Sequence, residues 1–310
     1  MTTSPFGALA VIADPRAGDG RVAGEIPAVE RALETRGLAY QLQVAHSGAD
    51  ATRLAREALE QGYRYLAAVG DDATVQDVVN GMFVEGRPIR QEPVLAVLPA
   101  NSGCDLVRSF GLPGDVDASS GHLLGDTTYP FDLMKIQVVG RDGRRLVRYA
   151  HNMVEIGLHA TAWRRREKIP RALGTARRFA GFWSAYATSR ALDLRVGIDG
   201  ATHELRGWTV LVGNGQFTDG GMRLSPRSFP GDGVLDALVF TGPKSDAYRL
   251  LPRMFRHGDH IPDANIRELR AKLQLSLDAA RPMPLVADGA YLGSTPAAIQ
   301  IVPRSILLKL

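Results

Sequence analysis

The chain has almost no cysteine: its 310 residues include only Cys104. A single thiol excludes an intrachain disulfide and a cysteine-rich metal centre. Long apolar runs are also missing, and no stretch approaches the ~20 residues that a membrane helix needs. The first residues lack a basic segment, and 7–13 (GALAVIA) is too short for the apolar core of a secretion signal. These absences predict a cytoplasmic protein whose contact with a membrane, if it has one, is peripheral.

The composition indicates a folded protein with room for two domains. Hydrophobic residues make up 45% of the chain and charged residues 23%, which is typical of globular proteins and argues against disorder. The formal net charge is +4 at pH 7. A mildly basic chain suits acidic partners such as nucleotides, phospholipid headgroups or nucleic acid, and it suits an ordinary basic surface equally well.

Strand and helix patterns alternate over the first 125 residues. Apolar runs predict strands at 7–13, 38–45, 65–69 and 94–98. Each run is followed by a turn and then by apolar residues at helical spacing, which predicts helices near 22–33, 51–58, 75–82 and 102–110. Repeated strand–helix units favour a parallel sheet with helices on both faces.

The pattern changes after Tyr129, where many short apolar runs are separated by turn residues. Strands are expected at 133–139, 145–156, 192–198, 208–212, 234–240, 273–277, 285–287, 299–302 and 306–308. This arrangement is typical of an antiparallel sandwich or barrel. We therefore predict an α/β domain over 1–129 and a β-rich domain over 130–310.

Three turns follow strands of the predicted parallel sheet, at 14–20, 70–74 and 99–105. Ligands of such sheets bind at the carboxyl ends of the strands, where turns present backbone N–H groups to phosphates. The acidic residues Asp71, Asp72 and Asp105 have the oxygen ligands that Mg²⁺ prefers. Thr74 and Ser102 are alternatively explained as helix N-caps, because threonine and serine are common at that position.

Taken in order, these motifs resemble those of the diacylglycerol kinase-like lipid kinases, a family that includes bacterial diacylglycerol kinases and, more distantly, sphingosine kinases. The family's GGDGT loop is similar to 70–74 (GDDAT), and its P-x-G-T-x-N-D-F-A-R-x-L-G-I-P segment is similar to 99–113 (PANSGCDLVRSFGLP). Further likenesses lie at 132–136, 152–157, 212–236 and 288–290. The resemblance spans nearly the whole chain.

The resemblance implies an NAD kinase/diacylglycerol kinase-like α/β domain followed by a β sandwich, with ATP and Mg²⁺ as cofactors and a lipid hydroxyl as the acceptor. By residue it implies nucleotide contacts at Gly70, Asp71, Asp72, Ala73, Thr74, Ser102 and Gly103. Asp72 would act in catalysis, and Asp105 and Asp132 would share a water–Mg²⁺ network with it. Asp232 would hold a separate structural Mg²⁺, or it is a simple turn aspartate.

The chain departs from the family pattern where the chemistry is expected. Asp71 and Ala73 replace glycines of the phosphate loop, and Asn101 replaces another. Glycine at such places permits a left-handed backbone, which asparagine and aspartate tolerate better than alanine does. Ala290 stands where the family has the glutamate that acts as general base, a role worth roughly 10²–10⁴-fold in rate.

Other side chains are candidates to replace that base. Asp288, two residues before Ala290, is the first, and Glu155 and His159 are further candidates for which a packing role is the stronger interpretation. The sequence leaves three functions open: a lipid kinase, a lapsed relative that binds nucleotide or lipid without turnover, and a phosphotransferase with a soluble acceptor such as NAD.

A basic stretch lies in the second domain over Arg164–Arg178, followed by aromatic residues at helical spacing from Phe179 to Tyr186. Such a segment suits an anionic membrane surface. A solvated basic face with aromatics packed on the β domain is the alternative. No nucleic-acid motif accompanies the charge, so we expect no nucleic-acid partner.

Overall fold

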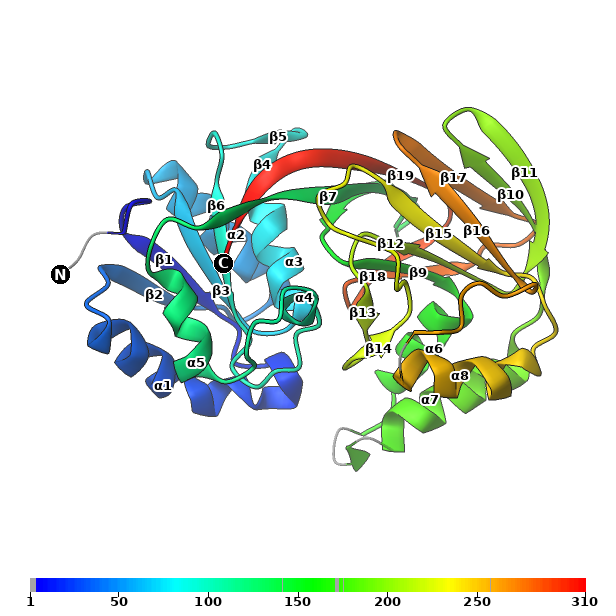
Figure 1. Cartoon of the computed structure of the whole chain (residues 1–310), viewed down its shortest axis with the longest axis horizontal. Coiled ribbons are helices and arrows are strands. Elements are labelled where there is room, and N and C mark those ends of the chain that lie inside the picture. The colour runs from blue at the N-terminus through cyan, green and yellow to red at the C-terminus, as the bar shows by residue number, and fades with distance from the viewer. Residues whose placement is uncertain (1–3, 141, 171–172, 175, 257) are drawn as a thin grey trace. The chain divides into compact units, whose positions relative to one another are not determined.

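The computed structural model describes residues 4–140, 142–170, 173–174, 176–256 and 258–310. The chain divides into two compact units, Met1–Leu133 with Pro303–Leu310, and Met134–Val302 (Figure 1). The strands β7 (Thr128–Val139) and β19 (Ala290–Lys309) each contribute to both units. The last eight residues, which the sequence pattern assigned to the second domain, thus pack with the first unit.

A parallel sheet forms the centre of the first unit. Its strands run in the order β2 (Tyr40–Val44), β1 (Leu9–Ala13), β3 (Tyr65–Val69) and β6 (Val94–Leu98), and the end of β19 adds in parallel to β6. Every residue of β1, β3 and β6 is buried. A strand covered on both faces reads as a continuous apolar run, which explains why these strands were predictable.

Helices follow the strands of this sheet. They are α1 (Val22–Thr35), α2 (Gly48–Glu60), α3 (Asp72–Gly81), α4 (Leu106–Ser109) and α5 (Val116–Ser120), with short 3₁₀ turns at Ala17–Gly20 and Gly121–Leu123 and a small hairpin of β4 (Phe83–Val84) and β5 (Arg87–Pro88). Apolar residues of α1 and α5 share a core with alternate residues of β1, β3 and β6, and α2 packs with α3. The helices therefore cover both faces of the sheet, as the sequence predicted.

The second unit is an antiparallel β structure. One path of strands runs β16 (Ile266–Ala271), β15 (Leu235–Phe240), β12 (Thr209–Gly213), β9 (Met153–Gly157), β18 (Pro284–Ala287) and β19. From β19 the pairing continues to β17 (Gln274–Ala279), β10 (Leu192–Ile198) and β11 (Ala201–Gly207), and β7 pairs with β8 (Arg145–Ala150). Alternate residues of these strands fill one common core. This is the interior of a sandwich.

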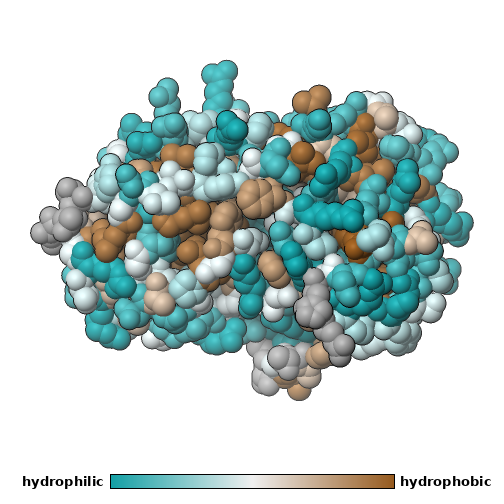
Figure 2. Space-filling view, viewed as in Figure 1, coloured by the Kyte–Doolittle hydropathy of each residue, from teal (hydrophilic) through white to brown (hydrophobic). Residues whose placement is uncertain are grey.

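Three helices cover the outer face of the β9, β12 and β15 strands: α6 (Leu158–Arg166), α7 (Ala176–Thr188) and α8 (Asp246–Arg256). A small hairpin of β13 (Phe217–Thr218) and β14 (Met222–Arg223) lies in the same unit. Both units expose a mixture of hydrophilic and hydrophobic residues (Figure 2). In the part of the chain that the structure describes, no helix is both long and apolar enough to span a bilayer.

Several predicted strands have different limits in the structure. The run 145–156 is two strands, β8 and β9, with a break at His151 and Asn152. The runs 299–302 and 306–308 are parts of the single strand β19, although Pro303 lies between them. The irregularity at that point is local: Arg304 has a φ of 47°, and its N–H donates to the Asp132 carboxylate at 2.7 Å.

Candidate functional site

The turns that follow β1, β3 and β6 meet at one edge of the parallel sheet. The Gly18 N–H donates to Asp71 Oδ2 at 3.2 Å, and the Ser102 hydroxyl donates to the Gly70 carbonyl at 2.7 Å. Gly18 has a φ of 62°, and a Cβ there would lie 2.7 Å from Ser102 Cα. Only glycine fits this close approach. The structure thus brings together the three turns that the sequence singled out.

Asp71 is the N-cap of α3. Its Oδ1 accepts hydrogen bonds from the Thr74 N–H and hydroxyl, both at 3.2 Å. The expectation that Thr74 is the N-cap is therefore wrong, because Thr74 lies three residues inside the capped turn. The N-terminus of a helix is also where proteins bind phosphate oxygens. In this chain the Asp71 carboxylate lies at the N-terminus of α3 and accepts the hydrogen bonds from Thr74 there.

The glycine replacements in the loop do not strain the backbone. Asp71 has a φ of −93°, and Ala73 lies inside α3. The expectation that position 73 needs a left-handed backbone is therefore wrong for this chain. Left-handed residues occur instead in the next turn, at Ala100, Asn101 and Gly103. At 71 the replacement changes the charge of the site rather than its backbone conformation.

Asp72 connects the second and third turns. Its Oδ2 accepts from the Asp105 N–H at 2.7 Å, and its Oδ1 accepts from the Leu106 N–H at 3.0 Å and from the Cys104 thiol at 3.4 Å. Asp105 is the residue at the N-cap position of α4, so the alternative that Ser102 caps this helix is also wrong. The Asp72 carboxylate supplies the acceptor that a capping side chain usually provides.

The carboxylates predicted to bind Mg²⁺ contact different partners. Asp105 is buried and forms an ion pair with Arg108 at 3.0 Å, whereas Asp132 is fully buried and contacts Arg304. Among the described residues, no three Asp, Glu, His or Cys side chains group as a metal site. Mg²⁺ often binds through one or two carboxylates plus phosphate oxygens and water. The Asp72 carboxylate, which accepts the Asp105 N–H, is a candidate ligand of this kind, and the described residues form no all-protein cage.

Two arginines that the sequence analysis did not single out border the first turn. Arg16 forms a double hydrogen bond with Asp14, at 2.9 and 2.7 Å, and this bond raises the pKa of the guanidinium. Arg21 donates to the Gly18 carbonyl at 2.8 Å and to the Ser102 carbonyl at 3.4 Å. Guanidinium groups bind phosphate oxygens through paired N–H donors. The sequence signal that could have identified these residues is the presence of two arginines within the turn 14–21.

In the second unit, Asp288 lies in the hairpin between β18 and β19. Asp288 and Gly289 have φ values of 45° and 78°, as in a two-residue type I′ turn. The carboxylate is fully buried and accepts backbone N–H bonds from His151 at 2.7 Å, Met153 at 2.8 Å and Asn152 at 3.2 Å. It therefore joins the hairpin to the break between β8 and β9.

Glu155 of β9 and His159 of α6 form a second group of titratable side chains. The Thr218 hydroxyl donates to Glu155 Oε1 at 2.9 Å, and His159 Nδ1 lies 4.0 Å from Glu155 Oε2. Burial is the main cause that raises the pKa of Glu155 to about 7 and lowers that of His159 to about 4. At 4.0 Å the two side chains do not share a direct hydrogen bond, and both are neutral near pH 6.

Two family models match the chain. The diacylglycerol kinase catalytic domain matches residues 8–136, and the YegS C-terminal NAD kinase beta sandwich-like domain matches residues 152–309. The chain belongs to the diacylglycerol kinase-like lipid kinase family. The fold predicted from the sequence is thereby confirmed.

Individual relatives are similar over nearly the full length of this chain. A Bacillus subtilis protein named diacylglycerol kinase is 22% identical over 303 residues, covering 96% of this chain and 94% of the relative. A Pseudomonas aeruginosa protein, named "Probable lipid kinase YegS-like", is 26% identical over 294 residues, covering 94% and 92%. A crystal structure of a diacylglycerol kinase from Bacillus anthracis Sterne superposes with a TM-score of 0.76 at 20% identity, covering 99% and 98%. This last likeness concerns the fold alone.

Ala290, the position at which the sequence resemblance places the family's glutamate, lies opposite Ala287 in the β18–β19 hairpin and packs against the sandwich core. The contacts of Asp288 favour a structural role over the predicted catalytic one, because its fully buried carboxylate accepts three backbone N–H bonds that join the hairpin to the break between β8 and β9. Asp232 is exposed, and its Oδ1 accepts the N–H of Val234 in its own turn at 3.0 Å. That contact fits the turn-aspartate alternative.

The basic stretch over Arg164–Arg178 is largely engaged in contacts within the second unit. Arg166 pairs with Asp219 at 2.6 Å, Arg178 donates to the Asp219 carbonyl at 2.9 Å, and Arg177 is buried. Arg165 donates to the Thr188 hydroxyl at 2.6 Å. Residues 171, 172 and 175 of the stretch lie outside the described residues. Most of these arginines therefore hold α6, α7 and the β13–β14 hairpin together.

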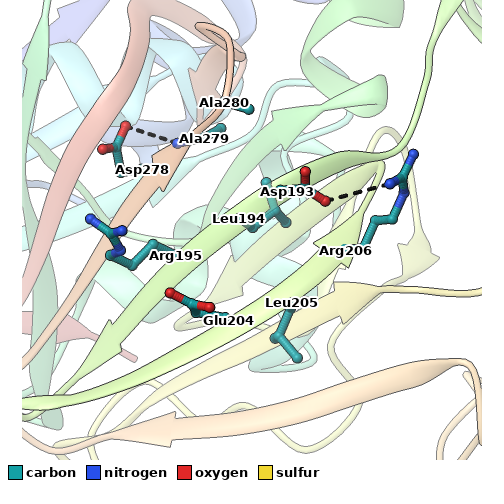
Figure 3. A pocket seen from close by; sticks show the side chains of 9 residues that line it. All are labelled: Asp193, Leu194, Arg195, Glu204, Leu205, Arg206, Asp278, Ala279 and Ala280. Carbon is teal, nitrogen blue, oxygen red and sulfur yellow. Dashed lines mark hydrogen bonds and ion pairs between the residues drawn. The ribbon is translucent and has the colours of Figure 1, made fainter.

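A pocket of about 630 Å³ lies elsewhere in the second unit, on the strands β10, β11 and β17 (Figure 3). It is lined by side chains such as Arg195, Glu204 and Asp278, and an Asp193–Arg206 ion pair of 3.6 Å lies at its side. None of the predicted site residues lines it. Arg195 lies opposite Glu204 and Asp278 in the register of the neighbouring strands. We assign the pocket no chemistry.

Proposed function

We propose that the chain transfers the terminal phosphate of ATP to the hydroxyl of a diacylglycerol-like lipid, with Mg²⁺ as the metal. The observation that carries this proposal is the meeting of three turns at the carboxyl edge of the parallel sheet. Membership of a lipid kinase family supports it, as do relatives named diacylglycerol kinase.

In this proposal the nucleotide phosphates lie against the first turn of α3 and the loop around Ser102 and Gly103. Arg16 and Arg21 supply positive charge that offsets the Asp71 carboxylate. Asp72 and Asp105 would hold Mg²⁺, with Asp132 as a further ligand, because carboxylate oxygens are the ligands that Mg²⁺ prefers. Bound Mg²⁺ supplies neutralisation of charge on the phosphate oxygens.

Because position 290 is alanine, no glutamate is present there to receive the proton of the acceptor hydroxyl. Phosphoryl transfer depends mainly on positioning and on charge stabilisation, so the loss of a base slows the reaction without abolishing it. The expected loss is roughly 10²–10⁴-fold. Glu155 has a pKa of about 7, which suits a general base at neutral pH, and the contacts of Asp288 make that residue the weaker candidate.

A lapsed relative that binds nucleotide or lipid without turnover is the second candidate function. Two observations favour it: the Asp71 carboxylate accepts donors at the N-terminus of α3, and Ala290 cannot accept a proton. A soluble acceptor such as NAD remains the third candidate, and the experiment below distinguishes it.

The deciding experiment incubates the folded protein with Mg²⁺ and γ-labelled ATP over a panel of hydroxylated lipids and, separately, NAD. Label in the organic phase that is lost in Asp72→Asn and in Thr74→Ala supports the lipid kinase. Thermal melting of both variants must show folded protein, because Asp72 accepts two backbone hydrogen bonds in the first unit. Label on NAD alone, or ATP binding without any transfer, would refute the proposal in favour of the other two functions.

A further inference from the structure

The Asp71 carboxylate connects two of the three turns at the edge of the parallel sheet. Its Oδ1 accepts the Thr74 N–H and hydroxyl, and its Oδ2 accepts the Gly18 N–H from the turn after β1. Thr74 is three residues away in the chain, whereas Gly18 is 53 residues away. A capping side chain ordinarily serves its own helix. Asp71 is therefore the N-cap of α3 and, in addition, an acceptor for a second turn.

The three donors that Asp71 engages are of the kind that bind phosphate. Two are backbone N–H groups, one in the first turn of α3 and one in a glycine turn, and the third is the Thr74 hydroxyl. Proteins hold phosphate oxygens with such groups. Thr74 and Gly18 are both buried, so their donors face the carboxylate rather than water. An incoming anion can use these donors only by displacing the carboxylate.

The distances indicate that the carboxylate can be displaced. All three donor–acceptor distances are 3.2 Å, whereas Asp115, the N-cap of α5, accepts the Ala118 N–H at 2.8 Å. N–H···O bonds in proteins are most often about 2.9–3.0 Å long. The Asp71 side chain is also only half-buried. It thus holds its donors loosely and has solvent to move into.

Positive charge lies next to the same donors. The pKa of the Arg16 guanidinium is raised, mainly by its hydrogen bond with Asp14, and the charge of Asp71 adds to this effect. Arg21 donates to the carbonyl of Gly18 at 2.8 Å. Arginine is well suited to phosphate oxygens. Without the Asp71 carboxylate, the donors and the arginines would remain and their internal anion would be gone.

We propose that Asp71 is an internal ligand of the phosphate site, which excludes small anions such as inorganic phosphate. A free phosphate must displace the carboxylate and gains only the same donors in return. A nucleotide also binds through its base and ribose, and this additional binding drives the displacement. The apparent affinity of every phosphate ligand is reduced in proportion to the fraction of molecules in which the donors are open. The inference rests on the proposed function in one respect, the placing of the nucleotide phosphates at α3.

The test measures the melting temperature of the full chain in inorganic phosphate, for the parent, Asp71→Gly and Asp71→Asn. Glycine is tolerated at an N-cap, so Asp71→Gly should fold. Its melting temperature should rise by about 2–4 °C when phosphate exceeds the dissociation constant tenfold. Acetate, which supplies the missing carboxylate, should also raise it. Asp71→Asn retains the cap and loses the charge, so we expect the same response at a smaller size. The parent should show neither response.

Asp115→Gly is the matched control, because Asp115 is also an N-cap aspartate of the first unit and accepts a backbone N–H of its own helix. Phosphate stabilises proteins in general, and the control measures that effect. Two results would overturn the proposal: a phosphate response of Asp71→Gly no larger than that of Asp115→Gly, or an equal response of the parent. If Asp71→Gly does not fold, Asp71→Asn replaces it, and a response equal to the parent's again overturns the proposal.

The transfer of label from ATP separates this inference from the proposed function. A phosphate response of Asp71→Gly without transfer to lipid by any variant would support the internal ligand and refute the lipid kinase. Transfer by the parent without a phosphate response of either Asp71 variant would do the opposite. The melting measurement needs no lipid and no turnover, so the two conclusions are reached independently.

Discussion

Glu155 and His159 are buried next to each other with pKa values displaced in opposite directions. The pKa of Glu155 rises from 4.5 to about 7 and that of His159 falls from 6.5 to about 4, in both cases mainly because burial disfavours the charged form. In the folded chain near pH 6 the carboxyl holds a proton and the imidazole does not. In the unfolded chain the proton assignment is reversed.

The consequence for stability follows from proton linkage. Folded Glu155 retains a proton that the unfolded chain has lost, so its contribution to the free energy of unfolding falls as pH rises from about 4.5 to 7. Folded His159 lacks a proton that the unfolded chain holds, so its contribution rises from about pH 4 to 6.5. Each of these displaced pKa values corresponds to a stability contribution of about 3 kcal/mol. Between about pH 4.5 and 6.5 the two contributions offset each other.

Single substitutions should reveal these opposed slopes. Glu155→Gln keeps an oxygen for the Thr218 hydroxyl, and its stability relative to the parent should increase by up to about 3 kcal/mol from pH 4.5 to 7. His159→Gln should lose stability relative to the parent from pH 4 to 6.5. The stability of the double variant relative to the parent should again depend little on pH between about 4.5 and 6.5. Glu204→Gln, at an exposed glutamate of the same unit, is the control and should show no slope.

The assay is urea unfolding at half-unit pH steps, followed by tryptophan fluorescence and circular dichroism together. The two signals report whether the units unfold in one transition, which the linear extrapolation requires. A difference between Glu155→Gln and the parent that is flat from pH 4.5 to 7 would show that the Glu155 carboxyl titrates as an exposed one. The assignment of a buried neutral pair would then fail.

Three further substitutions test the site. Asp71→Asn keeps the cap on α3 but removes its charge, and it should tighten ATP binding about fivefold by calorimetry, whereas Asp115→Asn at the cap of α5 should not. Asp288→Asn should lower the free energy of unfolding by about 2–4 kcal/mol, because three backbone donors lose their charged acceptor, and an unchanged urea midpoint would contradict this. Ala290→Glu should raise the rate at which label enters lipid. An unchanged rate would contradict the assignment of position 290 as the place of the general base.

The parallel sheet and the edge at which its turns converge were predictable from the sequence for one physical reason. Strands buried on both faces must be apolar throughout, so 65–69 and 94–98 stood out as continuous apolar runs. Parallel strands place all their carboxyl ends at one edge. The convergence of the turns at 14–20, 70–74 and 99–105 follows from that geometry and did not require any long-range contact to be known.

The exact partners at that edge were not predictable. Asp71 and Thr74 are both residues that cap helices, and only the structure shows that the Asp71 carboxylate accepts from Thr74. The role of Asp72 depends on N–H groups 33 and 34 residues further along the chain. Helix α8 was missed because Pro252 lies inside it, although proline usually ends a helix. In these cases tertiary contacts determine which residue caps a helix and whether a helix continues, because the local alternatives are similar in energy.

The two departures from the family pattern act on different quantities, and this separates a slow enzyme from a lapsed one. Asp71 lies in the first unit, and in the proposed function its charge would bear on nucleotide affinity. Position 290 lies in the second unit, and its side chain would bear on removal of the acceptor proton. In a slow enzyme, Asp71→Asn should lower the KM for ATP and Ala290→Glu should raise kcat, and the two effects should be additive because the residues share no contact partner. In a lapsed relative, the first substitution tightens ATP binding and neither one, alone or combined, produces transfer.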